Sequence, residues 1–236
     1  NFEQANAKGL TSTICFPSGN LAPQGSVVKS TSIDPTVIDS DGIYRMTGPA
    51  RLFYSEKEAM RAIKGLTEKN IVAGDVIILC GRGPMGSGME EVAQITLALK
   101  HLPWGKHVAL LTDARFSGVS TGACIGHIGP EALAGGPIGK LTEGDLIEIE
   151  INQKELKGKI NFIGETGQEI TPEEGAVILE NRTTPTSLRS DPRLPQDTRL
   201  WAALQNISGG TWGGCVYDIE EIIKVIEKGK VSIANK

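Results

Sequence analysis

Residues 75–88 of the chain read DVIILCGRGPMGSG. The five consecutive apolar residues predict a short strand buried on both faces, because a half-exposed strand would alternate apolar and polar residues. The glycine-rich run Gly81–Gly88 follows at once. After it we expect a helix over 89–102, with Ser87 and Glu90 forming its capping box. A strand, a glycine turn and a helix in this order predict one unit of an α/β fold.

Further strands are predicted on both sides of this unit. His107–Thr112 is a second apolar run of strand length, and Asp145–Ile151 alternates in the manner of a half-exposed strand, with a partner predicted at Leu156–Gly164. Before the unit, short β-prone runs at Thr11–Phe16 and Ser26–Ser30 are separated by turn signals. Strands on both sides of a βαβ-like centre predict a mixed α/β domain.

Other helices are indicated by their starting signals. Ser55 with Glu58 forms a capping-box pattern, and Thr171-Pro172 opens another helix with proline at its first position. The tail holds two more helical patterns, Thr198–Gln205 and Asp218–Lys228, after a polar, proline-bearing connector over 183–195. We therefore expect one main domain over 1–182 and a connector with a C-terminal helical extension over 183–236.

Composition excludes several classes of partner. The 236 residues carry 24 basic and 28 acidic side chains, a net charge of −4, and no basic run, which argues against nucleic-acid binding. No apolar stretch reaches the length of about 18 residues that spans a bilayer, so we expect no membrane contact. Four widely spaced cysteines without a CxxC pair argue against a structural zinc and predict reduced thiols in a cytoplasmic protein. Glycine is in excess, with 29 residues, which predicts many tight turns.

One motif within the glycine run supports an alternative function. Gly81-Arg-Gly83-Pro-Met-Gly86 follows a strand and precedes a helix, and Asp113 ends the next strand, as in a dinucleotide-binding turn. Against this, the expected helix begins after the third glycine, and no further βα units follow Asp113. A stand-alone phosphate- or dinucleotide-binding module using Gly81–Gly88 stays an alternative, as does a plain glycine-rich connection.

The segment over 113–132, DARFSGVSTGACIGHIGPEA, is the second unusual stretch. Small residues and hydroxyls gather at the carboxyl end of a buried strand, where α/β proteins place ligands. This composition suits an oxyanion-binding or proton-transfer site. A tight, well-packed turn explains it equally well.

Three segments together identify a family. DARFSGVSTGACIGHIGPEALAGGPIGKL, GPMGSGMEEV and SGNLAPQGSVVK resemble motifs of the dihydroxy-acid and sugar-acid dehydratases, which include the phosphogluconate dehydratases. The tail DTRLWAALQNISGGTWGGC is similar to the xylonate dehydratase branch. The resemblance runs from about Ser18 to Cys215, and it implies a swivelling β/β/α barrel-like domain of mixed strands with flanking helices.

The resemblance also implies a reaction and the residues that perform it. The family removes water from a 2,3-dihydroxy acid and forms a 2-keto acid. Ser117 falls on the serine that takes the C2 proton, and Glu91 falls on the glutamate that binds Mg²⁺. Arg115 and Gly118 are candidate substrate-binding residues. A structural role is the alternative for Arg115, which we expect to pair with Asp113 or to belong to a turn.

Two neighbours of these residues are expected to be structural. Glu90 matches a variable position of the family motif and already has a capping role, so we separate it from Glu91. His127 is expected to serve packing.

The resemblance further implies an iron–sulfur cluster and a Mg²⁺ ion, whose ligands lie mostly in an N-terminal domain that this sequence lacks. The four cysteines match no cluster-ligand motif: Cys15, Cys80, Cys124 and Cys215. With a chain that begins at Asn1, this predicts the C-terminal part of a longer dehydratase, inactive by itself and homo-oligomeric when complete.

Overall fold

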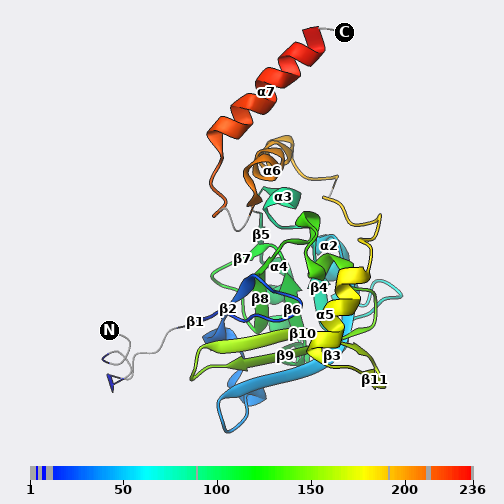
Figure 1. The fold of residues 1–236 in the computed structure, drawn as a ribbon. Coiled ribbons are helices and arrows are strands. Elements are labelled where there is room, and N and C mark those ends of the chain that lie inside the picture. Colours follow the sequence, from blue (N-terminus) through cyan, green and yellow to red (C-terminus); the bar gives the residue numbers. More distant parts are fainter. Residues whose placement is uncertain are drawn as a thin grey trace.

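The computed structural model describes residues 4, 7–8, 13–88, 90–190, 192–210 and 214–234. Within them, nine strands form one mixed sheet in the order β1-β2-β8-β6-β4-β3-β9-β10-β11 (Figure 1). The strands in this order are β1 Ile14–Cys15, β2 Gly25–Lys29, β8 Ala123–Gly129, β6 Ala109–Thr112, β4 Val76–Leu79, β3 Ile43–Phe53, β9 Asp145–Asn152, β10 Lys157–Glu165 and β11 Gln168–Glu169.

The centre of the sheet is parallel and its two flanks are antiparallel. Strands β3, β4, β6 and β8 pair in parallel with one another. The pairs that add β2 and β1 on one side, and β9, β10 and β11 on the other, are antiparallel. Every residue of β4 and β6 is buried. The two apolar runs therefore form the buried strands that the sequence predicts.

Side chains of the central strands divide between two cores. Val76 and Ile78 of β4 face the inner core with β9 and β10, while Ile77 and Leu79 face the outer core beneath two helices. This alternation follows from the period of two along a strand. The helices that cover the outer core are α2, Glu56–Ile63, and α4, Gln94–Lys100.

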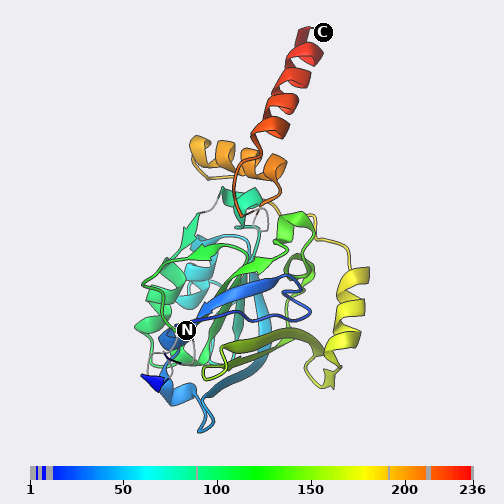
Figure 2. The same ribbon diagram turned by 60° about the vertical axis from the view of Figure 1, so that its left-hand side comes forward.

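The sheet curls into a half-barrel (Figure 2), and hydrogen bonds tie its two sides together. The amide of Ser18, between β1 and β2, donates to the Gly158 carbonyl at 3.1 Å, and the amide of Ile160 donates to the Ser18 carbonyl at 3.0 Å. These bonds join the β1–β2 connection to β10. The barrel-like mixed α/β fold implied by the family resemblance is thereby confirmed.

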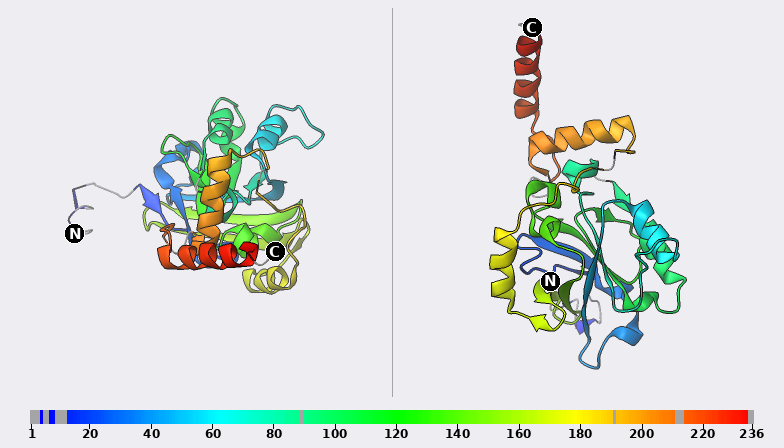
Figure 3. Two further views of the ribbon diagram at one scale, coloured as in Figure 1. Left: turned by 90° about the horizontal axis from the view of Figure 1, so that it is seen from above. Right: turned by 90° about the vertical axis from the view of Figure 1, so that its right-hand side faces the viewer.

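The remaining helices follow the predicted starting signals in most cases. Helix α5, Pro172–Asn181, begins at Thr171 with the capping box formed, since Thr171 and Glu174 each accept the other's amide. The two helices predicted in the tail are confirmed as α6, Gln196–Ser208, and α7, Ile219–Ala234. Figure 3 shows both beyond the sheet, on the side of the short helix α3, Pro84–Ser87.

One capping prediction is wrong, and one predicted helix begins later than expected. Ser55 lies at the start of α2, but its hydroxyl accepts from Arg193 and caps nothing. The helix predicted over 89–102 begins only at Gln94, while Met89 lies outside the described residues. Its first turn is capped by the Glu56 carboxylate, which accepts the amides of residues 93–95.

Among the residues that the structure describes, no helix is both long and apolar enough to cross a membrane.

Candidate active site at strands β5 and β7

Two short strands bring the two predicted site segments together. Strand β5, Glu91–Val92, runs parallel to β7, Arg115–Phe116, with Glu91 opposite Arg115 and Val92 opposite Phe116. The Ser117 amide continues this pairing by donating to the Val92 carbonyl at 3.0 Å. Glu91 therefore lies in a strand where the sequence predicts a helix. The local capping pattern around Ser87 is overridden by this long-range pairing.

The predicted catalytic and metal-binding side chains lie on one surface. Arg115 Nη2 is 3.9 Å from Glu91 Oε2, and both side chains are nearly half exposed. Ser117 is partly exposed and begins a tight turn, in which the Ser120 amide donates to the Ser117 carbonyl at 2.9 Å. The structure thus places Glu91, Arg115 and Ser117 together, with Arg115 paired to Glu91 and not to Asp113 as one expectation had it.

Gly118 lies at the open side of this turn. A Cβ atom built on it would meet nothing of the described chain within 4 Å. Its carbonyl accepts from the Lys29 ammonium of β2 at 3.1 Å. Lys29 was not singled out from the sequence, although it ends the SGNLAPQGSVVK segment, and its position brings a positive charge to the residue after Ser117.

The adjacent glutamates have different partners. Glu90 forms an ion pair with the largely buried Arg82, and its amide donates to Ser87 Oγ at 3.1 Å. Glu91 faces Arg115 instead. A structural role for Glu90 is thus supported by its ion pair and by the bond to Ser87, although no helix begins there.

Asp113 anchors both site segments from beneath. Its carboxylate is buried and accepts three backbone amides, those of Gly81, Arg82 and Ala132, each at 3.0 Å. Burial raises its pKa above the ordinary value, and the three N–H donors oppose that rise. One carboxylate therefore holds the start of the glycine run in register with the segment that leads to Ser117.

Glu131 is a second buried carboxylate behind the same loop. It accepts the Met85 amide at 2.9 Å, while its Oε1 has no hydrogen-bond partner. Burial, followed by the charge of Asp113, raises its pKa to about 7. A Cβ on Gly83 would lie 2.4 Å from Glu131 Oε2, so the close approach of this carboxylate requires glycine. No local sequence pattern singles out Glu131, although it lies in the unusual segment over 113–132.

The geometry of the glycine run Gly81–Gly88 does not favour phosphate binding. Amides that would cradle an anion donate to Asp113 and Glu131, and two carboxylates behind the loop would repel a phosphate. Asp113 is also too buried to reach a ribose hydroxyl. The geometry argues against the dinucleotide-binding alternative and explains the glycines by the protein's own carboxylates.

His127 packs against the site from behind. Its ring meets Phe116 edge-on with centroids 6.1 Å apart. Burial and then the nearby Arg115 lower its pKa, which favours the neutral imidazole. These contacts agree with the structural role expected for His127.

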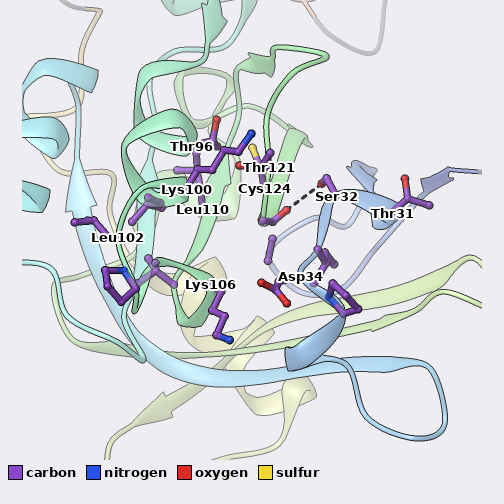
Figure 4. A pocket seen from close by; sticks show the side chains of 18 residues that line it. Thr31, Ser32, Asp34, Thr96, Lys100, Leu102, Lys106, Leu110, Thr121 and Cys124 are labelled. Atoms are coloured by element: carbon purple, nitrogen blue, oxygen red, sulfur yellow. Dashed lines mark hydrogen bonds between the residues drawn. The ribbon is translucent and has the colours of Figure 1, made fainter.

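A cavity lies beside this surface and not on it. It measures about 470 Å³ and lies between residues 31–35 on one side and α4 with residues 102–108 on the other, as Figure 4 shows. Two of its polar side chains are bonded within the chain: Ser32 donates to the Gly122 carbonyl and Lys106 to Thr36. Glu91, Arg115 and Ser117 do not line it.

The described residues do not by themselves form a metal site. Within the described ranges, no group of three or more histidine, cysteine or acidic side chains is placed to hold a metal ion. Glu91 is an accessible carboxylate that could serve as one ligand among several, since Mg²⁺ is usually held by one or two carboxylates with other oxygens.

The cysteines do not fit a cluster. Burial raises the pKa of Cys15 to about 11 and of Cys124 to about 12, and it raises that of Cys80 strongly. The half-buried Cys215 is raised as well. Cys15, Cys80 and Cys124 are buried, and among the described residues no three cysteine, histidine or acidic side chains come together as ligands.

Comparison with known proteins decides the family. Residues 4–178 match the family model described as dihydroxy-acid/6-phosphogluconate dehydratase C-terminal. The chain belongs to this family.

Among individual relatives, two D-xylonate dehydratases share more than half of their aligned residues with this chain. D-xylonate dehydratase YagF of Escherichia coli (strain K12) is 58% identical over 231 residues, which cover 98% of this chain and 35% of that protein. D-xylonate dehydratase YjhG of the same strain is 60% identical over 222 residues, 93% of this chain and 33% of that protein.

A dihydroxy-acid dehydratase of Lachnospira eligens is 45% identical over 157 residues, 66% of this chain and 27% of that protein. The chain thus spans about a third of the length of the D-xylonate dehydratases that it matches.

Proposed function

We propose that this chain is the C-terminal part of a hydro-lyase that dehydrates a sugar acid, of the xylonate type, to a 2-keto-3-deoxy acid. The observation that carries the proposal is the pairing of β5 with β7, which places Glu91 and Ser117 on one accessible surface. The high identity to two D-xylonate dehydratases supports the choice of substrate class.

In this proposal Ser117 Oγ, as an alkoxide, takes the proton from C2 of the substrate. The C2–H electron pair forms the C2–C3 double bond as the 3-hydroxyl departs with its bonding electrons, and the enol product tautomerises to the 2-keto acid. A serine hydroxyl is a weak base in water, so it needs positive charge nearby. Lys29, bonded to the carbonyl of the next residue, and Arg115, two residues before Ser117, supply positive charge from this chain.

Glu91 would provide one carboxylate ligand to Mg²⁺. The bound ion would supply charge stabilisation to the carboxylate and 2-hydroxyl of the substrate. We place the remaining Mg²⁺ ligands and the iron–sulfur cluster in an N-terminal domain, because the cysteines of this chain do not fit a cluster. No step of the mechanism above passes through the cluster.

The proposed organisation follows from these assignments. Residues 1–182 would form the barrel-like domain that closes over the N-terminal domain, and 183–236 the connector and helical extension. The complete enzyme would act in the cytoplasm, and this third of it would be inactive alone.

The test is an assay of the full-length polypeptide that carries this chain, loaded with its metals, against a panel of sugar acids. We expect D-xylonate to yield a 2-keto acid, detected as its hydrazone. A fully loaded enzyme that releases no 2-keto acid from any member of the panel would contradict the proposal.

A further inference from the structure

A lysine at the end of strand β2 contacts the turn that follows Ser117. Buried and half-buried residues alternate along β2, and Lys29 lies on its half-buried face. The Lys29 ammonium donates to the Gly118 carbonyl at 3.1 Å. A cation that lies 89 positions away in the chain is thereby attached to the residue after the proposed base.

The peptide group that Lys29 contacts also faces the Ser117 hydroxyl. The Gly118 carbonyl and the Val119 amide belong to one planar peptide unit. The Val119 amide donates to Ser117 Oγ at 3.5 Å. One peptide unit therefore lies between the ammonium and the oxygen that would take the C2 proton. Its acceptor end meets the lysine and its donor end meets the serine.

A peptide unit in this position transmits the charge of the lysine. Hydrogen bonds in a chain polarise one another, so an ammonium on the carbonyl oxygen makes the N–H of the same peptide a stronger donor. The bond of 3.5 Å to the neutral hydroxyl is long, whereas bonds to an ionised acceptor are shorter and roughly twice as strong. The Val119 amide therefore stabilises a Ser117 alkoxide more than it stabilises the hydroxyl.

The turn keeps its shape through other bonds. The Ser120 amide donates to the Ser117 carbonyl at 2.9 Å. At the far end of the turn, the Gly122 amide donates to the Ser32 carbonyl at 2.8 Å, and Ser32 Oγ donates to the Gly122 carbonyl at 3.1 Å. Because these bonds do not involve the Lys29 side chain, loss of its ammonium should leave the backbone of the turn in place.

We propose that Lys29 is a positioning residue of the dehydration, which acts through the Gly118–Val119 peptide to strengthen the hydrogen bond that stabilises the Ser117 alkoxide. The inference rests on the proposed role of Ser117 as the base. It goes beyond a general positive field, because it assigns the lysine one covalent and hydrogen-bonded path to the reacting oxygen. Lys29 keeps its own proton throughout, and Ser117 Oγ takes the proton from C2.

The kinetic test uses the full-length polypeptide loaded with its metals, with D-xylonate and with D-xylonate deuterated at C2. Lys29→Met should lower kcat about tenfold or more and leave KM within about twofold, because the lost interaction belongs to the transition state. The deuterium isotope effect on kcat should be at least as large as in the wild type, since proton removal becomes slower. Lys29→Arg, which keeps the charge, should recover most of the rate.

Two further variants complete this test. Lys106→Met is the matched control, because the Lys106 ammonium also donates to a group of this chain, the Thr36 hydroxyl, and its loss should leave kcat unchanged. Lys29→Gln can still donate a hydrogen bond but carries no charge, so it should lose rate as Lys29→Met does and decides the matter if that variant does not fold. An unchanged kcat in the neutral variants, a loss chiefly in KM, or a vanished isotope effect would overturn the proposal.

A spectroscopic measurement tests the path without turnover. In the 236-residue chain labelled with ¹⁵N, Lys29→Gln should move the Val119 amide resonances upfield, because the carbonyl of that peptide loses its charged partner, while Lys106→Met should not move them. Unmoved Val119 resonances in folded Lys29→Gln would overturn the inference. A fully loaded wild-type enzyme that forms no 2-keto acid, with Val119 shifted as expected, would instead contradict the proposed function and with it the catalytic part of the inference.

Discussion

The amide of Ser117 donates a hydrogen bond to the carbonyl of Val92 at 3.0 Å. This bond joins two segments that lie 25 positions apart in the chain. Through it, the predicted base and the predicted metal ligand, Glu91, belong to one small parallel pair of strands.

Asp113 should be the main structural anchor of the site. Replacing it with asparagine leaves one acceptor oxygen for three buried amides, so Asp113→Asn should cost about 1–3 kcal/mol of unfolding free energy. Urea unfolding measures this loss. The exposed Asp41→Asn is the control and should change stability by less than about 0.5 kcal/mol. Equal losses in the two variants would show that Asp113 anchors nothing.

Glu131 should make stability fall as the pH rises. Its pKa is about 7 in the folded chain against an ordinary 4.5, so between these values the folded state holds a proton that the unfolded state has released. The free energy of unfolding therefore decreases from pH 4.5 to about 7 and then levels off. Urea unfolding across this range should show a smaller slope for Glu131→Gln, which cannot titrate. An identical slope in both proteins would refute the role of Glu131.

Substitution of Glu90 and of Glu91 should have different effects on Mg²⁺ dependence and stability. In the full-length polypeptide, Glu91→Gln should raise the Mg²⁺ concentration for half-maximal activity about tenfold or more, a loss of at least ~1.4 kcal/mol of binding. Glu90→Gln breaks the ion pair with Arg82 and should alter stability more than Mg²⁺ dependence. Metal titration of activity distinguishes them. The reverse order would mean that the family motif is aligned one residue off.

Alanine substitution should lower stability at Gly86 and activity at Gly118. A Cβ on Gly86 would lie 2.2 Å from the Gly81 carbonyl oxygen, a backbone atom that cannot swing aside, so Gly86→Ala should destabilise by about 1–3 kcal/mol. Gly118→Ala has open space and should leave stability nearly unchanged while lowering activity, because the methyl group enters the side where substrate would approach. Thermal unfolding and turnover of both variants test this contrast. Full activity in Gly118→Ala would remove Gly118 from the site.

Much of the fold could be predicted from local pattern, and the rest depends on distant contacts. Strands β4 and β6 are recognisable because both faces are buried, which gives unbroken apolar runs. Closure of the half-barrel depends on bonds between Ser18 and β10, which no local pattern reveals.

The candidate site likewise has features that the sequence predicts and features that depend on distant contacts. Family motifs predict Ser117 and Glu91 as site residues. The local pattern predicts a helix at Glu91, whereas Glu91 lies in strand β5. Ser87 does accept the Glu90 amide, so the capping pattern is partly real, and pairing with β7 then takes the chain in another direction. Glu56 and Lys29 were missed because each acts on a segment far from it in sequence.

The central claim is that Ser117 is the base of a dehydratase. The most direct measurement is the rate of 2-keto acid formation from D-xylonate by the full-length polypeptide, comparing Ser117→Ala with Ser120→Ala. Ser120 lies three residues further on and is buried against Thr96. We predict that Ser117→Ala retains its metals and loses at least about a hundredfold in rate, as expected when a general base is removed, while Ser120→Ala stays within a fewfold of wild type. A Ser117→Ala enzyme that turns over D-xylonate at nearly the wild-type rate would contradict the account.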